Sequence, residues 1–477
     1  MYSRIVKQIQ FLMDKISRYT LLIIFSAIFT AGVFFKAMYS FDDSPYFTMP
    51  DRYDGIAALV AVGIAAVACH KRKWIQKYLN YKLCFVVYML CAGLLILLVP
   101  LQPFSDMEAV YKGALYFSKL HWQEMMQDEY WNVFPGNVKL SVFWGVLLFP
   151  LPKTLISCKL LNALFIYVTA VLTGKLAKVC GLCYDKLAYL SLLCFVPLFL
   201  YTNQIYFDTP FLMLSVMALY MYIKYQNLLG AAAVLGLAQF LRQNAMIYFA
   251  AIVIVYLFQN KEMVADGTWK QKFVKFLVAV LLFFALSKGL SGIVRSQFMN
   301  EDVQFYPLWN QIYIGINEDE FGFMDGDFSY DRSFADVVRR IQEYGPRRFC
   351  NILFKKTFWL WSQGTYQAQR YAFGNDVENW DEKFEYETIV TGFLLKDGQI
   401  LRKLCNAFMR AQYGLFFGLM IFAIYRGRKQ ETFRIFYYIF MAVFLIMLFY
   451  ELKSRYILSV LPLMAIFAVS TLEETDQ

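Results

Sequence analysis

Long apolar runs alternate with short polar loops along this chain. The runs at 19–35, 83–99, 187–200, 273–286 and 435–449 approach the roughly 17 to 25 residues that a helix needs to cross a bilayer core. Lipid offers no hydrogen-bond partner to backbone amides, so each membrane-spanning run must be helical. The pattern predicts an all-α polytopic membrane protein with about 12 transmembrane helices.

One polar stretch, residues 101–139, interrupts this pattern between two apolar segments. Its carboxylates are Asp106, Glu108, Glu124, Asp128 and Glu129. A chain with 59% hydrophobic residues has little reason to gather these groups unless water, a cation or a substrate meets them there. We interpret the stretch as the catalytic loop of an integral membrane enzyme.

The composition supports a membrane protein and argues against a nucleic-acid-binding one. Charged residues make up 17% of the chain, below the roughly 25% of soluble domains, and the mean hydropathy is +0.44. The net charge of +10 is explained by basic loops, because Lys and Arg collect on the cytoplasmic side of membrane proteins. These loops, at 71–82, 175–186, 261–275 and 426–434, predict a multi-pass plasma-membrane protein with both termini cytoplasmic.

The apolar segment 140–151 decides the topology. At about 12 residues it is short for a span. If it crossed the membrane, the basic loop 175–186 would face outward; if it lies on the outer surface as an interfacial helix, every later basic loop is cytoplasmic. We therefore expect an interfacial helix.

This topology divides the chain into five regions. They are an N-terminal membrane hairpin with the first core span (1–100), an external catalytic loop with interfacial helices (101–154), a membrane core (155–290), an external cap (291–407) and C-terminal membrane helices (408–477). Within the cap, the segment 354–367, FKKTFWLWSQGTYQ, is expected at the membrane interface, where aromatic residues and lysines are favoured.

Several ionisable residues should meet at the outer face. Such groups cost at least ~2.5 to 3.5 kcal/mol each near the membrane centre and therefore mark a site or a partner. Carboxylates beside arginines indicate a hydroxyl activator next to an anion binder. The residues concerned are Asp106, Lys139, Asp208, Arg242, Glu451 and Arg455.

A structural role is an open alternative for four of these residues. Glu451 and Arg455 have the i, i+4 spacing of a helical ion pair. Arg242 could cap a hairpin, and Lys139 could extend its charge to the membrane surface.

The order of five short motifs resembles that of the GT-C membrane glycosyltransferases, which include protein O-mannosyltransferases and aminoarabinose transferases. The motifs are SDMEAVYKGA, FPGN, YFDTP, LRQN and ELKSRYILSVLP, scattered between residues 103 and 463. The resemblance implies a GT-C fold with external juxtamembrane helices.

The resemblance also implies roles for individual residues. Asp106 corresponds to the catalytic base of the first external loop and Asp208 to a second acidic residue, while Arg242 and Arg455 would hold the lipid phosphate. Many members have an adjacent Asp-Glu pair, whereas here Met107 separates Asp106 from the catalytic candidate Glu108. Further candidates for substrate binding are Lys139, Glu451 and Tyr456.

The implied reaction moves a monosaccharide from a polyprenyl-phosphate carrier to a hydroxyl acceptor at the extracytoplasmic face, with inversion. The acceptor would be a cell-envelope polymer, a glycolipid or a protein. A phosphate leaving group needs neutralisation more than protonation, so arginines can replace a general acid and one carboxylate suffices as base.

Only His70 and His121 exist, which excludes a histidine-rich zinc site. Mg²⁺ or Mn²⁺ bound by Asp106 and Asp208 is possible. A polysaccharide polymerase and a lipid-linked sugar transporter or flippase are the alternative functions.

Overall fold

The structure is a computed structural model that describes most of the chain. The described residues are 2–39, 44–259, 269–300, 303–318, 321–323, 328–373, 384–393, 400–427 and 430–473. Parts of the predicted external cap and of the basic loops 261–275 and 426–434 lie outside these residues.

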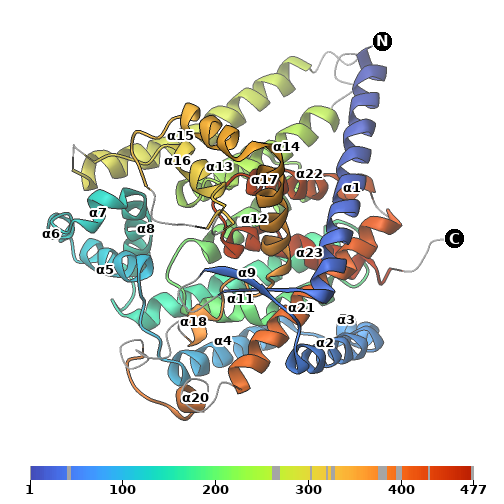
Figure 1. The fold of residues 1–477 in the computed structure, drawn as a ribbon, viewed down its shortest axis with the longest axis horizontal. Coiled ribbons are helices and arrows are strands. Elements are labelled where there is room, and N and C mark those ends of the chain that lie inside the picture. Colours follow the sequence, from blue (N-terminus) through green and yellow to red (C-terminus); the bar gives the residue numbers. More distant parts are fainter. Residues whose placement is uncertain are drawn as a thin grey trace.

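Helices form at every apolar run of the sequence, which confirms an all-α protein of membrane character (Figure 1). They are α1 (Tyr2–Phe34), α2 (Arg52–His70), α4 (Tyr81–Leu98), α9 (Leu155–Val179), α10 (Asp185–Leu193), α11 (Val196–Leu200), α12 (Asp208–Tyr225), α13 (Leu228–Leu241), α14 (Ala245–Gln259), α15 (Trp269–Phe298), α21 (Ile400–Arg426), α22 (Gln430–Met447) and α23 (Leu461–Ser470).

Six of the described helices are long and apolar enough to cross a membrane, namely α1, α2, α4, α9, α15 and α21. The segments Asp185–Leu193 and Val196–Asn203 meet at an angle of 53° and make a seventh span if they are counted as one. Shorter apolar helices include α13 and α14. The count of about 12 spans stays a prediction.

The polar stretch 101–139 folds into short helices, followed by a longer apolar one over the 140–151 segment. The elements are α5 (Asp106–Ser118), α6 (Trp122–Met125), α7 (Tyr130–Val133), the 3₁₀ turn η1 (Pro135–Asn137) and α8 (Val138–Leu148). The expected helix in 140–151 is therefore present. In Figure 1, α5, α6 and α7 lie at the left edge, far from the start of α1 at the upper right.

Two glycines let α5 and α8 pack closely. A Cβ added at Gly113 would lie 2.5 Å from the Ser141 hydroxyl, and one at Gly145 would lie 2.6 Å from the Phe117 ring. Side chains larger than hydrogen would force the helices apart. This contact fixes the position of Asp106 at the start of α5.

The remaining elements connect these helices. They are the hairpin β1 (Lys36–Tyr39) and β2 (Pro45–Thr48), which pairs Lys36 with Thr48, together with α3 (Arg72–Tyr78), η2 (Tyr201–Asn203), α16 (Leu308–Gly315), α17 (Phe334–Ser362), α18 (Arg370–Phe373), α20 (Ile389–Thr391) and η5 (Ser454–Val460).

The expectation of an interfacial aromatic segment at 354–367 requires a correction. Trp359 and Trp361 of α17 are buried inside the fold. The Trp361 ring lies 4.8 Å from the Phe25 ring of α1 and 6.4 Å from the Phe417 ring of α21. Aromatic composition is the same for an interface and for a packed core, so the sequence could not distinguish them.

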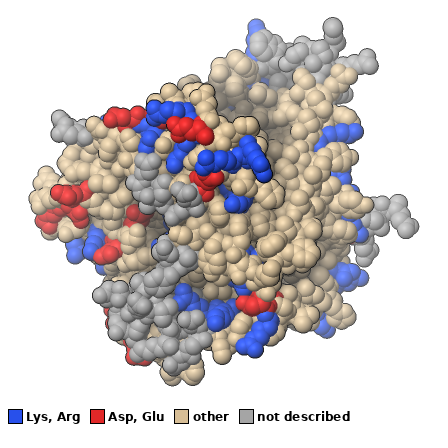
Figure 2. Space-filling model, viewed as in Figure 1, with Lys and Arg blue, Asp and Glu red and all other residues tan. Residues whose placement is uncertain are grey.

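Charged side chains are unevenly distributed over the surface. Along the right-hand edge of the face in Figure 2 the visible charged residues are Lys and Arg, whereas elsewhere on this face Asp and Glu appear together with Lys and Arg. The cytoplasmic placement of the basic loops stays a prediction.

The cysteines serve as small apolar side chains or surface residues. Cys350 and Cys405, which the sequence allowed as a pair, are both free thiols. Of the Cys180 and Cys183 pair, the first is buried and the second is exposed.

Candidate active site

Asp106 is the first residue of α5 and follows a strained residue. Ser105, the N-cap, has φ 52° and ψ −137°, a backbone conformation that side chains other than glycine rarely adopt. The helix N-terminus favours a negative charge at Asp106 because the helix dipole points its positive end there. The sequence therefore places an ionised carboxylate where the backbone is held under strain.

Two tyrosine hydroxyls contact the Asp106 carboxylate, and an asparagine side chain connects the two tyrosines. The Tyr130 hydroxyl donates to Oδ1 at 2.7 Å, and the Tyr206 hydroxyl lies 3.3 Å from Oδ2. Asn137 joins the two tyrosines, since its Nδ2 donates to Tyr130 at 2.6 Å and its Oδ1 accepts from Tyr206 at 3.0 Å.

The hydrogen-bond count leaves one Asp106 oxygen available. A tyrosine hydroxyl has a single proton, so Tyr206 can donate fully either to Asn137 or to Asp106. The bond to Asn137 is the shorter one. Burial, and then the Asp106 charge, raise the pKa of both Tyr130 and Tyr206, which stay protonated donors. Oδ2 of Asp106 is therefore free to accept a proton from another molecule.

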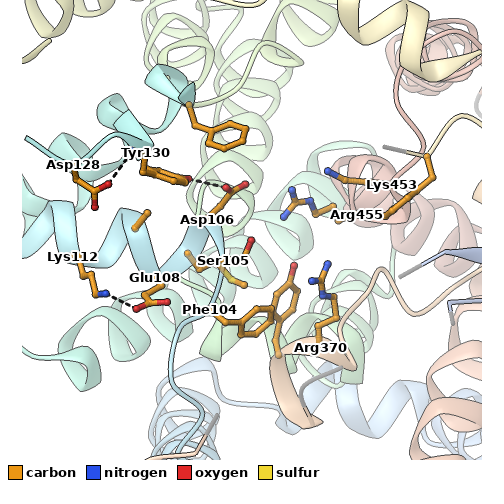
Figure 3. A pocket seen from close by; sticks show the side chains of 15 residues that line it. Phe104, Ser105, Asp106, Glu108, Lys112, Asp128, Tyr130, Arg370, Lys453 and Arg455 are labelled. Atoms are coloured by element: carbon orange, nitrogen blue, oxygen red, sulfur yellow. Dashed lines mark hydrogen bonds and ion pairs between the residues drawn. The ribbon is translucent and has the colours of Figure 1, made fainter. Parts of the chain in front are cut away.

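Basic residues face Asp106 across a cavity of about 610 Å³. Figure 3 shows Arg455, Lys453 and Arg370 pointing toward the space that Asp106 and Tyr130 border from the opposite side. We call this space the polar chamber. Its other charged lining residues are Glu108, Lys112 and Asp128.

Arg455 is a cation without a carboxylate partner in the described part of the chain. Its guanidinium lies 5.2 Å from the ring centre of Tyr206 and 5.9 Å from that of Tyr456. Its Nε is buried and makes no hydrogen bond. Enclosing a charge without a close counter-ion is costly, so this half-buried arginine is suited to an anionic ligand.

A second cavity, of about 260 Å³, shares Asp106, Lys453 and Arg455 with the polar chamber. We call it the aromatic chamber. Seven of its other lining residues are aromatic, namely Phe134, Tyr206, Phe207, Phe305, Tyr306, Phe328 and Tyr456, and the rest are Val133, Pro135, Gly136, Asn137, Gln311 and Glu451. The proton acceptor and the unpaired cation thus stand at the junction of two cavities.

The alternative ion pair between Glu451 and Arg455 does not form, because Glu451 pairs with Lys453 instead. Glu451 precedes η5, so helical i, i+4 spacing does not apply, and its carboxylate lies 2.6 Å from the Lys453 amine and accepts from Tyr456 at 2.8 Å. Burial raises the pKa of Glu451, but Lys453 and the Tyr456 hydroxyl outweigh burial and hold it below its ordinary value. Glu451 therefore fixes Lys453 and Tyr456.

Asp208 and Arg242 form a buried ion pair outside both chambers. Arg242 Nη1 lies 2.9 Å from Asp208 Oδ1, and the two side chains are 7% and 0% exposed. Gln204 donates to Oδ2 of Asp208 at 3.0 Å, and the Arg242 guanidinium packs on Phe207 and Tyr456. Neither residue lines the two chambers, and Arg242 packs against two residues of the aromatic chamber; the catalytic and phosphate-binding roles of this pair stay predictions.

Glu108 and Lys139 take different positions from the ones expected. Glu108 borders the polar chamber but pairs with Lys112 at 2.5 Å, one turn along α5. Lys139 lines neither chamber. Burial, and then the nearby Lys288, lower the pKa of Lys139 to about 8. The proximity of Lys288 could not be predicted from the sequence, because this lysine lies in the distant helix α15.

The carboxylates do not fit a shared metal ion. Asp106 is held by tyrosines, whereas both oxygens of Asp208 accept bonds from Arg242 and Gln204. Among the described residues no three His, Cys, Asp or Glu side chains gather as a possible metal site. A divalent cation bridging Asp106 and Asp208 is not supported by this geometry.

Sequence reasoning missed five residues of the site. Asn137, Tyr206 and Lys453 lie inside the motifs FPGN, YFDTP and ELKSRY, so the motifs pointed to the right places but not to these side chains. Tyr130 and Arg370 reach the site from elements with no such motif, α7 and α18.

No protein-family model, no curated protein and no solved structure matches this chain. What the site can do therefore follows from its own residues.

Proposed function

We propose that this protein is an integral membrane glycosyltransferase of GT-C type. It transfers a monosaccharide from a polyprenyl-phosphate carrier to a hydroxyl acceptor at the extracytoplasmic face of the plasma membrane. One observation carries the proposal: a proton-accepting carboxylate, Asp106, and a half-buried cation that forms no ion pair with the described carboxylates, Arg455, border the same two cavities. A base beside an anion site is what transfer from a phosphate leaving group requires.

The reaction assigns one chamber to each substrate. The polar chamber holds the phosphate and sugar of the donor, because Arg455, Lys453 and Arg370 line it together. The acceptor hydroxyl enters from the aromatic chamber, because Oδ2 of Asp106 is on the side of Tyr206, which lines that chamber. The carrier lipid remains in the surrounding bilayer.

Asp106 removes the proton of the acceptor hydroxyl as its oxygen attacks the anomeric carbon. A new C–O bond forms while the bond between that carbon and the phosphate oxygen breaks. The electron pair leaves with the polyprenyl phosphate, whose charge the basic residues neutralise. Attack opposite to the leaving group inverts the anomeric configuration.

The test is donor consumption by the purified protein in nanodiscs. A panel of polyprenyl-phosphate monosaccharides is incubated with the protein, and released carrier phosphate is measured with and without hydroxyl acceptors. We expect acceptor-dependent release from at least one donor in the parent and none in Asp106→Asn. Release that is equal in both proteins would refute the proposal.

A lipid-linked sugar transporter or flippase is the second candidate, favoured by the bend between α10 and α11. Transporters place such breaks at a substrate site. Here the side chain of Gln412 in α21 forms hydrogen bonds with backbone groups at the bend. It accepts from Val196 N at 3.0 Å and donates to Cys194 O at 3.1 Å. Movement of an intact lipid-linked sugar across liposomes would favour transport, whereas cleavage favours transfer.

A polysaccharide polymerase also uses a lipid-linked donor and external basic residues. The products distinguish it: a polymerase lengthens the acceptor repeatedly, whereas the proposed enzyme adds one sugar.

A further inference from the structure

A third cavity, of about 440 Å³, has a neutral polar lining. Its residues are Asn132, Asn300, Val303, Gln304 and Tyr330. Three of them carry amides and one a phenol, so the described part of this lining holds hydrogen-bond donors and acceptors and neither a carboxylate nor a cation. We call this space the amide chamber.

The amide chamber lies next to the aromatic chamber. Residues 132–133, 304–306 and 328–330 each contribute side chains to both spaces. Neighbouring residues of the same three segments therefore line one cavity and then the other. The two spaces therefore adjoin one another along these three segments.

Stacked aromatic rings lie where the two chambers adjoin. The rings of Tyr306 and Tyr330 lie 4.3 Å apart and only 5° from parallel, and Phe328 lies 5.1 Å from Tyr306. Tyr306 and Phe328 line the aromatic chamber, whereas Tyr330 lines the amide chamber. Aromatic faces carry partial negative charge and pack well on the weakly positive C–H faces of sugar rings.

The amides are positioned by contacts across the cavity. Asn300 Nδ2 donates to the Asn132 carbonyl oxygen at 3.3 Å and lies 3.5 Å from the backbone oxygen of Met126. An amide offers donors and acceptors at once, as each sugar hydroxyl does. Gln304 is exposed and adds a further amide. Among the described lining residues, a charged ligand would find no counter-ion.

We propose that the amide chamber binds a neutral sugar unit of the acceptor, so that the acceptor is an oligosaccharide or a glycan chain rather than a hydroxyl of a peptide. The unit that receives the new sugar stands in the aromatic chamber beside Asp106, and the preceding unit lies against Tyr330. This inference rests on the proposed function and names the class of its acceptor.

The test is oligosaccharide binding by the full-length protein in nanodiscs without donor. The probes are a panel of neutral oligosaccharides of hexoses, N-acetylhexosamines and deoxyhexoses, with an oligogalacturonate and a serine-containing peptide for comparison. We expect at least one neutral probe to bind and the charged probe and the peptide to bind at least tenfold more weakly. Binding of no neutral probe, or equal binding of the peptide, would overturn the inference.

Substitutions locate the binding site. Tyr330→Ala should lower the affinity for the neutral probe at least tenfold. Tyr116→Ala is the control and should leave that affinity unchanged, because Tyr116 is similarly exposed, at 39% against 37% for Tyr330, but lies outside the amide chamber. Gln304→Ala serves as a second variant if Tyr330→Ala does not fold, because it removes only an exposed side chain. Unchanged affinity in the folded variants would also overturn the inference.

Separate outcomes test the two proposals. If the protein cleaves a lipid-linked donor for a non-carbohydrate acceptor, and Tyr330→Ala does so at the parental rate, the inference fails and the proposed function stands. If a neutral oligosaccharide binds in a manner that depends on Tyr330 but no donor is ever consumed, the proposed function fails and the sugar site stands.

Discussion

Tyr206 carries one proton, and two acceptors compete for it. Its hydroxyl lies 3.0 Å from Asn137 and 3.3 Å from Asp106, so the shorter bond leaves Asp106 with an accepting oxygen. An ion pair would have neutralised this carboxylate, whereas phenols and an amide hold it in place and leave its charge intact. The side chains around Asp106 therefore favour a base over a structural carboxylate.

We expect Asp106→Asn to lower the rate of sugar transfer by about 100- to 10,000-fold, because the amide keeps the shape but cannot take a proton. Donor affinity should change little. Single-turnover transfer and donor binding check this, with Glu124→Gln as a control carboxylate that borders neither chamber. Activity within about tenfold of the parent would remove Asp106 from the role of base.

We expect Arg455→Ala to weaken donor binding by about 10- to 150-fold, since hydrogen bonds to a charged group contribute roughly 1.5 to 3 kcal/mol. The donor affinity of Arg455→Lys should be intermediate, because lysine keeps the positive charge but lacks the planar guanidinium that forms two parallel hydrogen bonds with a phosphate. Arg339→Ala, which removes a surface arginine that pairs with Asp336, is the control.

A double substitution separates this role from a structural one. Glu451 pairs with Lys453, so Arg455→Gln should not strand that carboxylate. Adding Glu451→Gln should therefore not restore donor affinity. Recovery of near-parental transfer in the double variant would contradict the phosphate role of Arg455.

The sequence identified Asp106 and Arg455 because charged residues stand out in an apolar chain. It could not show which charges neutralise one another. Asp208 and Arg242 lie 34 positions apart, and their pairing depends on how α12 and α13 meet. Neutral partners such as Tyr130 are equally hidden, since tyrosine is common in this chain.

At the scale of elements, a buried lysine joins three segments behind the site. The Lys356 amine of α17 donates to the backbone oxygens of Gly315, at the end of α16, and of Tyr450. Leu452 N donates to Gly322 O at 2.7 Å in the same region. The chain that carries Glu451, Lys453 and Arg455 is thus anchored to the region between α15 and α21.

We expect Lys356→Met to destabilise the protein by about 1–3 kcal/mol for each carbonyl that loses its donor. Burial lowers the pKa of Lys356 to about 7, against the opposing effect of Glu451. The unfolded chain, with an ordinary lysine pKa near ~10.4, therefore binds more protons above pH 7.

This difference fixes the sign of the pH dependence. Raising the pH from about 7 toward 9 should stabilise the parent relative to Lys356→Met, and the gap between their Tm values should widen. Below pH 6.5 the gap should stay constant. Thermal unfolding of both proteins across this range checks the prediction, and a gap that narrows as the pH rises would contradict it.

At the scale of the whole molecule, hydropathy predicted where helices form but not how they pack. Every apolar run became a helix, because membrane insertion and core burial select for the same residues. The bend between α10 and α11 and the burial of Trp359 depend on contacts with distant helices. Such contacts leave no periodic signal in the sequence.

The predicted topology places Ser105 outside and Lys178 inside, and both are exposed. In a cysteine-free background, an impermeant maleimide should label Ser105→Cys in intact cells and label Lys178→Cys only after permeabilisation. Thr209 and Ser454 are buried and unsuitable for labelling. Labelling of Lys178→Cys in intact cells would show that α8 crosses the membrane.

The unpaired guanidinium of Arg455 has a kinetic consequence. On the proposed function, the spent carrier is a more highly charged phosphate than the sugar-linked donor, so the same cation retains it more strongly. Product inhibition follows, and release of the carrier rather than bond cleavage limits turnover. The rate of the enzyme in its membrane would then follow the speed at which other proteins recharge or remove the used lipid.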